Sequence, residues 1–461
     1  MFPNPGCSTL LVLCLLVRVV HAQTDSATHN ESYSSSGEQL VNDLHQRCFT
    51  YFLELSDSIS GLTHEKYPEA ACSDVAATGF SLAAYIIGAE NHYISHRQAI
   101  ERVLRTLRFL VKLPAGKETA GKCGYRGFYY HQLDFRKGIR CGYSLLSPQA
   151  TAILLAGALC CMTYFDAWQS EEREIRRLAK ILYRRADWNW MCHAEETPCS
   201  GWSPEIGFNL EHLYGYDESM LMMILALGSP SHPLPVSSWK AWTSSCQWAS
   251  AEGFDYLQCA PLAGHQLAHA FLDLRGVKDD LMRQTGIDYF ENSRRATLAQ
   301  MNYAIRNPLR FRDYSKTIWG FSTCDGPGNT RAAWRTGESV FKGRTVRGFT
   351  GGFLSDDGTV CPAAAGCSLP FAYEECRTAI DSIYRKYGSK VYRRYGFVNA
   401  FNPSFTGGQG NFAGWFSPYT YGADAGMLLL LLENQRSGLI WKIMKKNEYV
   451  AEGLRRAGFS K

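Results

Sequence analysis

Two kinds of helix alternate along this chain, and the alternation limits the folds that are open to it. The segment 74–88 is apolar almost all round, whereas 95–113 carries charge on one face only. The same pair recurs as 147–165 and 170–188. A helix without a polar face has to be surrounded by protein, and a helix with a charged stripe can lie outside it. The pattern therefore predicts an inner ring of buried helices inside an outer ring.

Acidic residues stand at the start of the later apolar segments. Asp217 opens the segment 217–227, and Asp424 opens the segment 424–434. In a double ring the inner helices all run the same way, so their first residues converge on one rim. About twelve helical segments follow residue 38, and no long alternation of period two requires a sheet. We therefore predict an all-α fold, an (α/α)6 toroid of about twelve helices with long aromatic-rich loops at one rim.

The first part of the chain is predicted to lie outside this domain. Residues 1–22 have the pattern of a secretory signal peptide, with an apolar core at 10–17 and a small-residue cleavage site that ends at Ala22. Residues 23–37 form a polar leader, rich in Ser and Thr, that we expect to be disordered. Residues 38–461 are predicted to form a single catalytic domain. The expected location is therefore extracellular.

The cysteines fit an extracellular protein. Two of the 16 lie in the predicted signal peptide, which leaves 14, and an even number in a secreted chain favours disulfides. Cys160 and Cys161 lie inside an apolar segment and are predicted to be buried thiols. No zinc-ligand spacing is present, so no structural metal is expected. Local pairs that flank loop-like segments are predicted to be bonded: Cys123 with Cys141, Cys192 with Cys199, and Cys361 with Cys367.

Charge and hydropathy exclude two kinds of partner. The net charge is +5, and the basic residues are scattered along amphipathic segments rather than set in a stripe with aromatics. This distribution is typical of a solvated outer face and not of a nucleic-acid site. The longest apolar run, 427–432, is far too short to span a bilayer. We expect a monomer that binds neither nucleic acid nor membrane.

The long loops favour a carbohydrate cleft. The segments 114–146, 192–216, 307–370 and 388–421 are rich in Gly and aromatic residues. Long loops in a compact domain usually carry function. Aromatic rings cover the apolar faces of sugars, and carboxylate, Arg and Asn groups bind hydroxyls in pairs. For any single ring, packing inside the protein is the alternative.

Hydrolysis of a glycosidic bond requires a proton donor and a second carboxylate. Glu218 is flanked by Tyr214 and Tyr216, which would raise its pKa into the range of an acid catalyst. The alternative is structural, because Asp217 and Asp424 could be helix N-caps and Glu218 could favour the helix dipole. Asp134 could serve in a turn or bind substrate.

A further polar group shares one helix face. His265, His269 and Asp273 are spaced four residues apart, and Arg275 follows them. This spacing could hold a metal ion, but no other motif supports one. We therefore predict that these residues line the wall of the cleft.

A set of sequence strings occurs in the same order as in a known family. The strings are Ala76–Phe80, Tyr216–Glu218, Leu225–Pro230, His265–Gln266, His269, Asp273–Gly276, Tyr289–Gln300, Trp319–Gly320, Cys324–Gly328, Ser368–Phe371, Asn399–Pro403 and Glu433–Asn434. They lie between Ser73 and Phe459, which is 387 positions (459 − 73 + 1). Together they resemble the glucoamylase-like domain of secreted endo-β-1,2-glucanases.

The resemblance implies an (α/α)6 barrel that cleaves β-1,2-glucan internally with inversion and without a cofactor. Glu218 matches the general acid of the family and Asp424 its general base, which reaches the attacking water through a relay. The residues that we expect to form the substrate subsites are Asp134, Tyr216, Asp217, His265, Asp273, Arg275, Trp319, Asp325 and Trp415.

One position departs from the family. Its members usually carry an Asp just before the Thr of the second inner helix, where this chain has Ala150 before Thr151. Asp134 or Gln149 could replace it, or the linkage preference could differ. Related domains in cyclic glucan synthases are retaining transglycosylases, which is one alternative. A glycan-binding protein without activity and a polysaccharide lyase are two others.

Overall fold

The computed structural model describes residues 37–69, 71–334, 337–350, 352–406 and 414–461. The chain separates into two units, residues 1–35 and 36–461, and the fold below is that of the second. The predicted signal peptide lies outside the described residues. So does the predicted leader, except for Gly37, with which the first helix begins.

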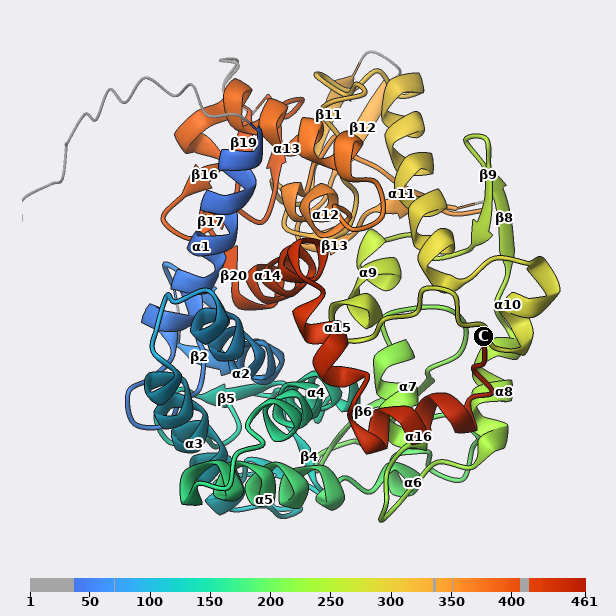
Figure 1. Cartoon of the computed structure of the whole chain (residues 1–461). Helices are drawn as coiled ribbons and strands as arrows, with labels where there is room; N and C mark the ends of the chain where they lie inside the picture. The colour runs from blue at the N-terminus through green and yellow to red at the C-terminus, as the bar shows by residue number, and fades with distance from the viewer. Residues whose placement is uncertain (1–36, 70, 335–336, 351, 407–413) are drawn as a thin grey trace, which may run out of the picture. The chain divides into compact units, whose positions relative to one another are not determined.

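Six helices form a closed inner ring (Figure 1). Each contacts the next in the order α2, α4, α7, α9, α12 and α14, and α14 returns to α2. Their bounds are Val75–Glu90 for α2, Pro148–Tyr164 for α4, Met220–Leu227 for α7, Leu262–Phe271 for α9, Pro362–Cys367 for α12 and Gly422–Arg436 for α14. The apolar segments of the sequence are thus inner helices, as predicted.

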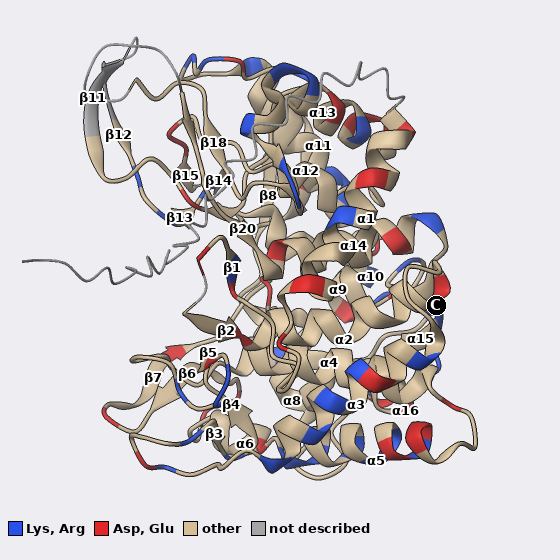
Figure 2. Cartoon of the chain, turned by 90° about the vertical axis from the view of Figure 1, so that its left-hand side faces the viewer, with Lys and Arg blue, Asp and Glu red and all other residues tan. Residues whose placement is uncertain are grey.

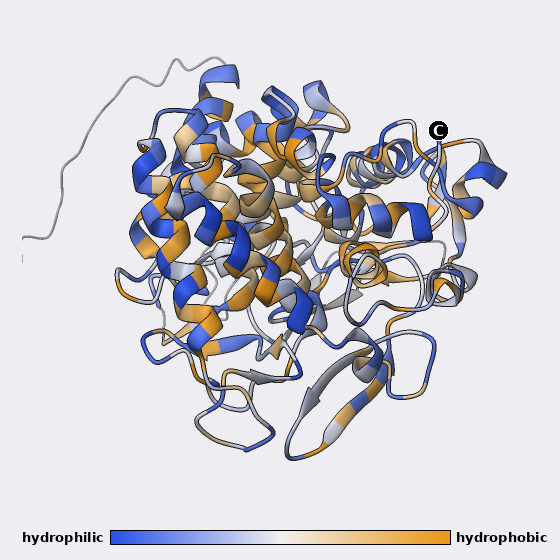
Figure 3. Cartoon of the chain, turned by 60° about the horizontal axis from the view of Figure 1, so that its bottom comes forward, coloured by the Kyte–Doolittle hydropathy of each residue, from blue (hydrophilic) through white to orange (hydrophobic). Residues whose placement is uncertain are grey.

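Amphipathic helices surround this ring. α1 packs on α14 and α2, α3 on α2 and α5, α5 on α4, α11 on α9, and α13 on α12, while the C-terminal α16 covers α7. Hydrophilic and hydrophobic residues alternate around the outer helices (Figure 3). Their bounds are Gly37–Leu55 for α1, His96–Lys112 for α3, Ser170–Arg185 for α5, Val236–Ser244 for α8, Tyr289–Arg306 for α11, Tyr373–Tyr387 for α13 and Glu448–Arg456 for α16. Short helices complete the set: α6 (Trp188–Met191), α10 (Asp280–Thr285), α15 (Leu439–Met444) and the 3₁₀ turn Gly388–Lys390.

The helix starts have local causes in the sequence. The Asp74 carboxylate accepts hydrogen bonds from the backbone of Ala76 and Ala77 and so caps α2. Ser147 caps α4, and Pro148 occupies the first turn, where its missing N–H costs nothing. Ser95 and Gln98 form a reciprocal capping box at the start of α3.

The loops before the inner helices are joined to one another by short antiparallel pairs. β1 (Lys66–Tyr67) pairs with β20 (Thr420–Tyr421), which joins the loops before α2 and α14. β2 (Cys72–Asp74) pairs with β5 (Gln132–Asp134), which joins those before α2 and α4. Leu146, before α4, forms a bridge with Trp202 of β6, before α7.

Two more contacts join the loops before α9, α12 and α14. Leu262 N donates to Phe321 O at 3.0 Å, and Val360 forms a bridge with Phe401 of β18. The N-termini of the inner helices therefore share one rim, and the strands gather on that side (Figure 2). The other pairs are β3 (Gly124–Tyr125) with β4 (Phe128–Tyr129), β6 (Cys199–Ser203) with β7 (Gly207–His212), β8 (Trp248–Ala251) with β9 (Phe254–Leu257), β10 (Thr323–Cys324) with β13 (Thr345–Val346), β11 (Thr330–Trp334) with β12 (Gly337–Phe341), β14 (Gly348–Phe349) with β15 (Leu354–Ser355), β16 (Tyr392–Arg393) with β17 (Gly396–Phe397), and β18 (Phe401–Asn402) with β19 (Trp415–Phe416).

The cysteine pairs differ from the prediction. The structure has a disulfide between Cys72 and Cys141. Cys141 N donates to Gln132 O, so Cys141 lies beside the β2–β5 pair that contains Cys72, and the predicted bond between Cys123 and Cys141 is wrong. Cys160 and Cys161 are buried thiols, as predicted. The other two predicted pairs are not bonded, and their members are buried thiols: Cys192, Cys199, Cys361 and Cys367.

Candidate active site

Glu218 lies in the turn that leads into α7. The Oδ1 atom of Asp217 accepts a hydrogen bond from Ser219 N at 2.8 Å and another from Ser219 Oγ. Trp242 Nε1 donates to Ser219 Oγ at 2.9 Å and anchors the turn to α8. Asp217 therefore fixes the turn, which is close to the N-cap alternative raised from the sequence.

The Glu218 carboxyl group has the protonation state that an acid catalyst needs. Its side chain is half-buried. Burial and, to a smaller extent, the negative charge of Asp217 together raise its pKa to about 7. At neutral pH a large fraction of Glu218 thus holds a proton that it can donate.

Asp424 lies in the first turn of α14 and is half-buried too. Asn399 Nδ2 donates to Asp424 Oδ2 at 2.6 Å. Burial raises the pKa of Asp424, and the negative charges of Asp325 and Asp74 act in the same direction. The positive charge of Arg344 and the hydrogen bond from Asn399 oppose the rise without cancelling it.

Asp325 holds the loops beside Asp424. Its carboxylate accepts hydrogen bonds from Arg344 Nη1 at 3.2 Å, from Tyr421 OH at 3.1 Å and from Ser417 Oγ at 3.0 Å. The backbone N of Asp325 donates to Asn399 Oδ1 at 2.6 Å. Both ends of the Asn399 amide are therefore engaged, which fixes its orientation toward Asp424.

A histidine lies beside Asp74 on the same rim. His131 Nε2 lies 3.5 Å from Asp74 Oδ2, and the His131 side chain is 48% exposed. The negative charge of Asp74 raises the pKa of His131, Glu65 adds to the rise, and Arg344 opposes it. Because Arg344 and Asp74 also act on Asp424, these groups belong to one electrostatic cluster.

The ring order places Glu218 and Asp424 opposite each other. They begin α7 and α14, which are three steps apart in a closed ring of six helices. Both lie at the N-terminal rim, where the loops before the inner helices are joined. The structure thus brings to one rim the two carboxylates singled out from the sequence.

Three of the predicted subsite residues are covered by protein. Tyr216 is 5% exposed, and its ring lies 5.7 Å from that of Tyr289 and 5.1 Å from that of His265. His265 is 1% exposed. Trp319 is fully buried, and its Nε1 donates to Lys316 O. These rings pack against other side chains, which does not fit the predicted contact with sugar.

Two other predicted residues lie at the wrong end of the ring. Asp273 and Arg275 follow the C-terminus of α9, so they lie away from the N-terminal rim. Arg275 forms a two-fold ion pair with Asp273 and lies 4.3 Å from the ring of Trp441, in α15. Their predicted role in the cleft is therefore wrong.

The remaining predicted positions stay on the rim side. Asp134 Oδ1 accepts hydrogen bonds from the backbone of Arg136 and Lys137, which is the structural alternative for this residue. Trp415 is half-buried in β19. Ala150 is 3% exposed, and its N–H is bonded to Ser147 Oγ, so it offers no polar group to the rim.

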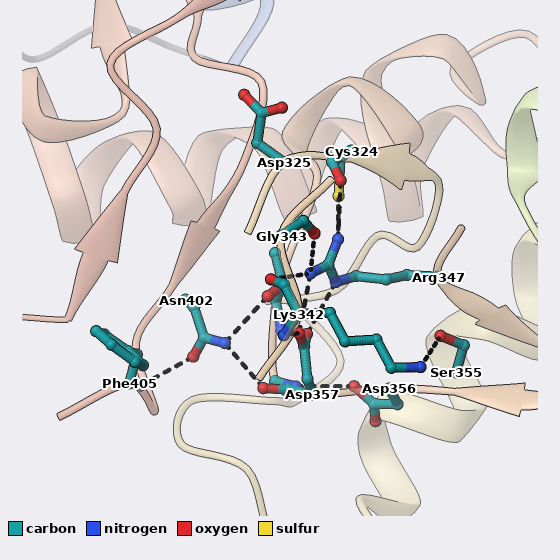
Figure 4. Close-up of polar contacts among 12 residues, drawn as sticks. Cys324, Asp325, Lys342, Gly343, Arg347, Ser355, Asp356, Asp357, Asn402 and Phe405 are labelled. Atoms are coloured by element: carbon teal, nitrogen blue, oxygen red, sulfur yellow. Dashed lines mark hydrogen bonds and ion pairs between the residues drawn. The ribbon is translucent and has the colours of Figure 1, made fainter. Parts of the chain in front are cut away.

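A buried ion pair supports the segment that carries Asp325 (Figure 4). Arg347 Nε and Nη2 donate to the two carboxylate oxygens of Asp357 at 2.8 and 2.9 Å. Arg347 Nη1 donates to Cys324 O at 2.8 Å, and Asn402 Nδ2 donates to Asp357 O at 2.8 Å. The backbone of Cys324, which precedes Asp325, is thus fixed by the buried Arg347.

Sequence reasoning did not find Asn399, Arg344 or His131 as members of the site. Asn399 begins one of the strings that carry the family resemblance, and this signal could have drawn attention to it. Among the residues that the structure describes, no group of three His, Cys, Asp or Glu side chains has the arrangement of a metal site. In the same residues, no helix is both long and apolar enough to cross a membrane.

The fold and the site define a class, an (α/α)6 toroid with two opposed carboxylates on its loop-bearing rim. Residues 211–448 match the family model described as "Putative glucoamylase", and the chain belongs to that family. This confirms the glucoamylase-like domain that the sequence strings indicated.

Known proteins similar to this chain have related descriptions. A crystal structure from Bacteroides uniformis, described as a putative glucoamylase, is 27% identical, with a TM-score of 0.78 over 93% of this chain and 98% of that chain. An endo-β-1,2-glucanase from Chitinophaga pinensis, in complex with sophorotriose and glucose, is 23% identical, with a TM-score of 0.77 over 93% of this chain and 99% of that chain. These structures confirm the toroid fold.

A curated relative is the exo β-1,2-glucooligosaccharide sophorohydrolase (non-reducing end) of Parabacteroides distasonis. It is 24% identical over an alignment of 468 residues, and the alignment covers 94% of this chain and 59% of that protein. This chain therefore spans less than two thirds of the length of that relative.

Proposed function

We propose that the protein is a glycoside hydrolase that cleaves β-1,2-linked glucan internally with inversion. The observation that carries the proposal is the placement of Glu218 and Asp424 at the starts of opposite inner helices on one rim. Membership of the family and the descriptions of its relatives support the substrate class.

Glu218 is the general acid of this proposal. It donates its proton to the glycosidic oxygen as the bond to the anomeric carbon breaks. Its pKa of about 7 suits this step, because the group is protonated before the step and ionised after it.

Asp424 is the general base. It draws a proton from the water that attacks the opposite face of the sugar, through a relay of water or substrate hydroxyls. The hydrogen bond from Asn399 orients its carboxylate. A base of this kind has to be ionised, and the positive charge of Arg344 favours that form.

The point of attack has a second candidate. The relative from Parabacteroides distasonis is described as exo-acting at the non-reducing end, whereas that from Chitinophaga pinensis is an endo-glucanase. Exo action would release one short product from the end of the glucan. Internal cleavage would release oligosaccharides of many lengths.

Linear β-1,2-glucan is the substrate that tests the proposal. Proton NMR of a fresh digest follows the anomer that forms first, and product sizing follows the chain length. We expect a rapid fall in mean length and an inverted anomeric configuration. Retained configuration with longer products would show a transglycosylase, and release of a single short product would show exo action.

A pair of variants tests the acid. Glu218→Gln removes the proton donor and is expected to lower kcat/KM by about 10²–10⁴-fold. Glu211→Gln is the matched control, because Glu211 is an exposed glutamate of the preceding strand β7 and should leave the rate unchanged. Equal activity of the two variants would remove Glu218 from the mechanism.

We also propose that the protein is secreted and acts outside the cell as a monomer on this polysaccharide. The pattern of residues 1–22 supports secretion. Expression of the full chain in eukaryotic cells, with the N-terminus of the protein in the medium determined by sequencing, tests it. We expect a chain that begins at Gln23, and a chain retained in the cells with Met1 would contradict secretion.

A further inference from the structure

Two buried cysteines lie side by side at the base of the rim. Cys324 ends β10, and Cys361 immediately precedes α12. Their exposed fractions are 0% and 2%. Cys361 N donates to Gly320 O at 2.9 Å, so the two backbone segments are adjacent. The side chains of the two cysteines interact directly, and each shifts the pKa of the other.

We propose that Cys324 and Cys361 form a disulfide bond in the mature protein. The adjacent backbone segments and the direct interaction of the two side chains bring the thiols next to each other before any bond forms. Disulfide formation requires side chains that already face each other, and it otherwise needs backbone movement.

The geometry favours this pair over the pair expected from sequence spacing. Cys361 and Cys367 lie at the two ends of α12. Six residues of α-helix extend about 9 Å, and a disulfide does not bridge Cα atoms more than about 7 Å apart. Cys361 therefore cannot reach Cys367, whereas Cys324 is in contact with it.

A nearby cation favours the chemistry. Arg347 Nη1 lies 3.6 Å from Cys324 Sγ. The hydrogen bond from Cys361 and the positive charge of Arg347 lower the pKa of the Cys324 thiol against the effect of burial. Cys324 is thus the thiol of the pair that more readily forms the nucleophilic thiolate.

The bond forms by thiol–disulfide exchange with a small disulfide such as oxidised glutathione. The Cys324 thiolate attacks one sulfur of this oxidant and releases one thiolate. The Cys361 thiolate then attacks Cys324 in the mixed disulfide and releases the second. The two cysteines lose two protons and two electrons in total, and the oxidant becomes two thiols. Because both side chains are buried, the exchange takes place during folding, before the loops close.

The bond would strengthen the support of the proposed base. Asp325 directly follows Cys324, and its backbone N holds Asn399, which in turn donates to Asp424. A disulfide from Cys324 to Cys361 would connect the segment that carries Asp325 to the start of α12, which is an inner helix. The inference about the bond itself does not depend on the proposed activity.

Peptide mapping tests the inference directly. The full chain is unfolded, reduced, and refolded in a buffer of reduced and oxidised glutathione. The remaining thiols are then alkylated under denaturing conditions, and the protein is digested without reduction. We expect a linked pair of peptides that contain Cys324 and Cys361, with a mass two hydrogens below their sum. The bond between Cys72 and Cys141 is the internal positive control.

The opposite result is equally clear. If Cys324 and Cys361 both carry the alkyl group while Cys72 and Cys141 are linked, the inference is wrong. Alkylated Cys160 and Cys161 show that denaturation exposed the buried thiols, and their accessibility validates either result.

A variant series separates the bond from simple packing. With a disulfide, Cys324→Ala, Cys361→Ala and the double variant should lower the midpoint of thermal unfolding by nearly the same amount, since each removes the same bond. Decreases that add up in the double variant would show two independently packed thiols. Cys160→Ala is the control, and it should leave the linked peptide of Cys324 and Cys361 in place.

Discussion

Glu218 has a pKa that makes its role testable by pH alone. Burial and the charge of Asp217 raise the pKa to about 7, so the proton needed for catalysis is lost as the pH rises through 7. We expect kcat/KM to fall on the alkaline side of about pH 7. Asp217→Asn removes the neighbouring negative charge, lowers the pKa of Glu218, and should shift this decline to lower pH.

The measurement for this prediction is the pH profile of kcat/KM on β-1,2-glucan, which reports the free enzyme. The amide oxygen that Asp217→Asn introduces could still accept the hydrogen bonds from Ser219 that fix the turn, so the variant changes charge more than geometry. Glu211→Gln should leave the profile in place. A decline that stays at the same pH in Asp217→Asn would show that Asp217 does not act on the acid.

The two carboxylates could be found from the sequence, but their neighbours could not. Glu218 and Asp424 stand at the starts of apolar segments, and a local pattern reveals that position. The contact between Asn399 and Asp424 depends on how two loops meet. Tyr216 has the residue type of a sugar platform, yet the same aromatic ring packs in a core, and residue type does not distinguish these uses.

The inner helices α2 and α4 approach each other closely, and this contact allows a test of the inner ring. A Cβ atom at Gly157 of α4 would lie 2.0 Å from Gly79 O of α2. Gly157→Ala therefore forces the two backbones apart and should lower the free energy of unfolding by about 1–3 kcal/mol, as overpacked cores do. Denaturation in urea measures this. Gly343→Ala is the control, because a Cβ there meets nothing within 4 Å and should change stability little.

The C-terminal end of α9 explains why Asp273 and Arg275 were wrongly predicted to line the cleft. Spacing placed His265, His269 and Asp273 on one helix face, but α9 ends at Phe271, and Asp273 follows it. Periodicity does not reveal where a helix stops. Arg275→Met should therefore leave kcat/KM on β-1,2-glucan within about twofold, while the loss of a partly exposed ion pair costs about 1 kcal/mol or less. A large fall in kcat/KM with unchanged stability would contradict this prediction and show that Arg275 takes part in the active site.

The double ring as a whole was predictable because it depends on composition along helices. Apolar and amphipathic segments alternate in the sequence, and burial forces the first kind inside. The individual contacts that close the ring were not predictable, since they join segments that are distant in the sequence. The covering of α7 by the C-terminal α16 is one example. The paired loops are another, because the pairs β1–β20 and β2–β5 have only two or three residues per strand.

The ring closes where the first outer helix meets the last inner one, and a buried carboxylate joins them. Glu433 of α14 accepts hydrogen bonds at 2.9 Å from His45 of α1 and at 3.0 Å from Asn91, after α2. Burial raises the pKa of Glu433, but its hydrogen bonds lower it more, so the net pKa lies below the ordinary 4.5.

Glu433→Gln should lower the free energy of unfolding by about 1.5–3 kcal/mol at pH 7. Because the folded pKa is the lower one, this difference should shrink as the pH falls below about 4.5. Urea denaturation at several pH values measures it. Glu452→Gln of α16 is the control, because the Glu452 side chain is 43% exposed and forms only a surface ion pair with Arg455, so the change in stability should be less than about 0.5 kcal/mol. A loss in Glu433→Gln that is independent of pH would mean that α1 and α14 are held by packing and not by the charge of this group.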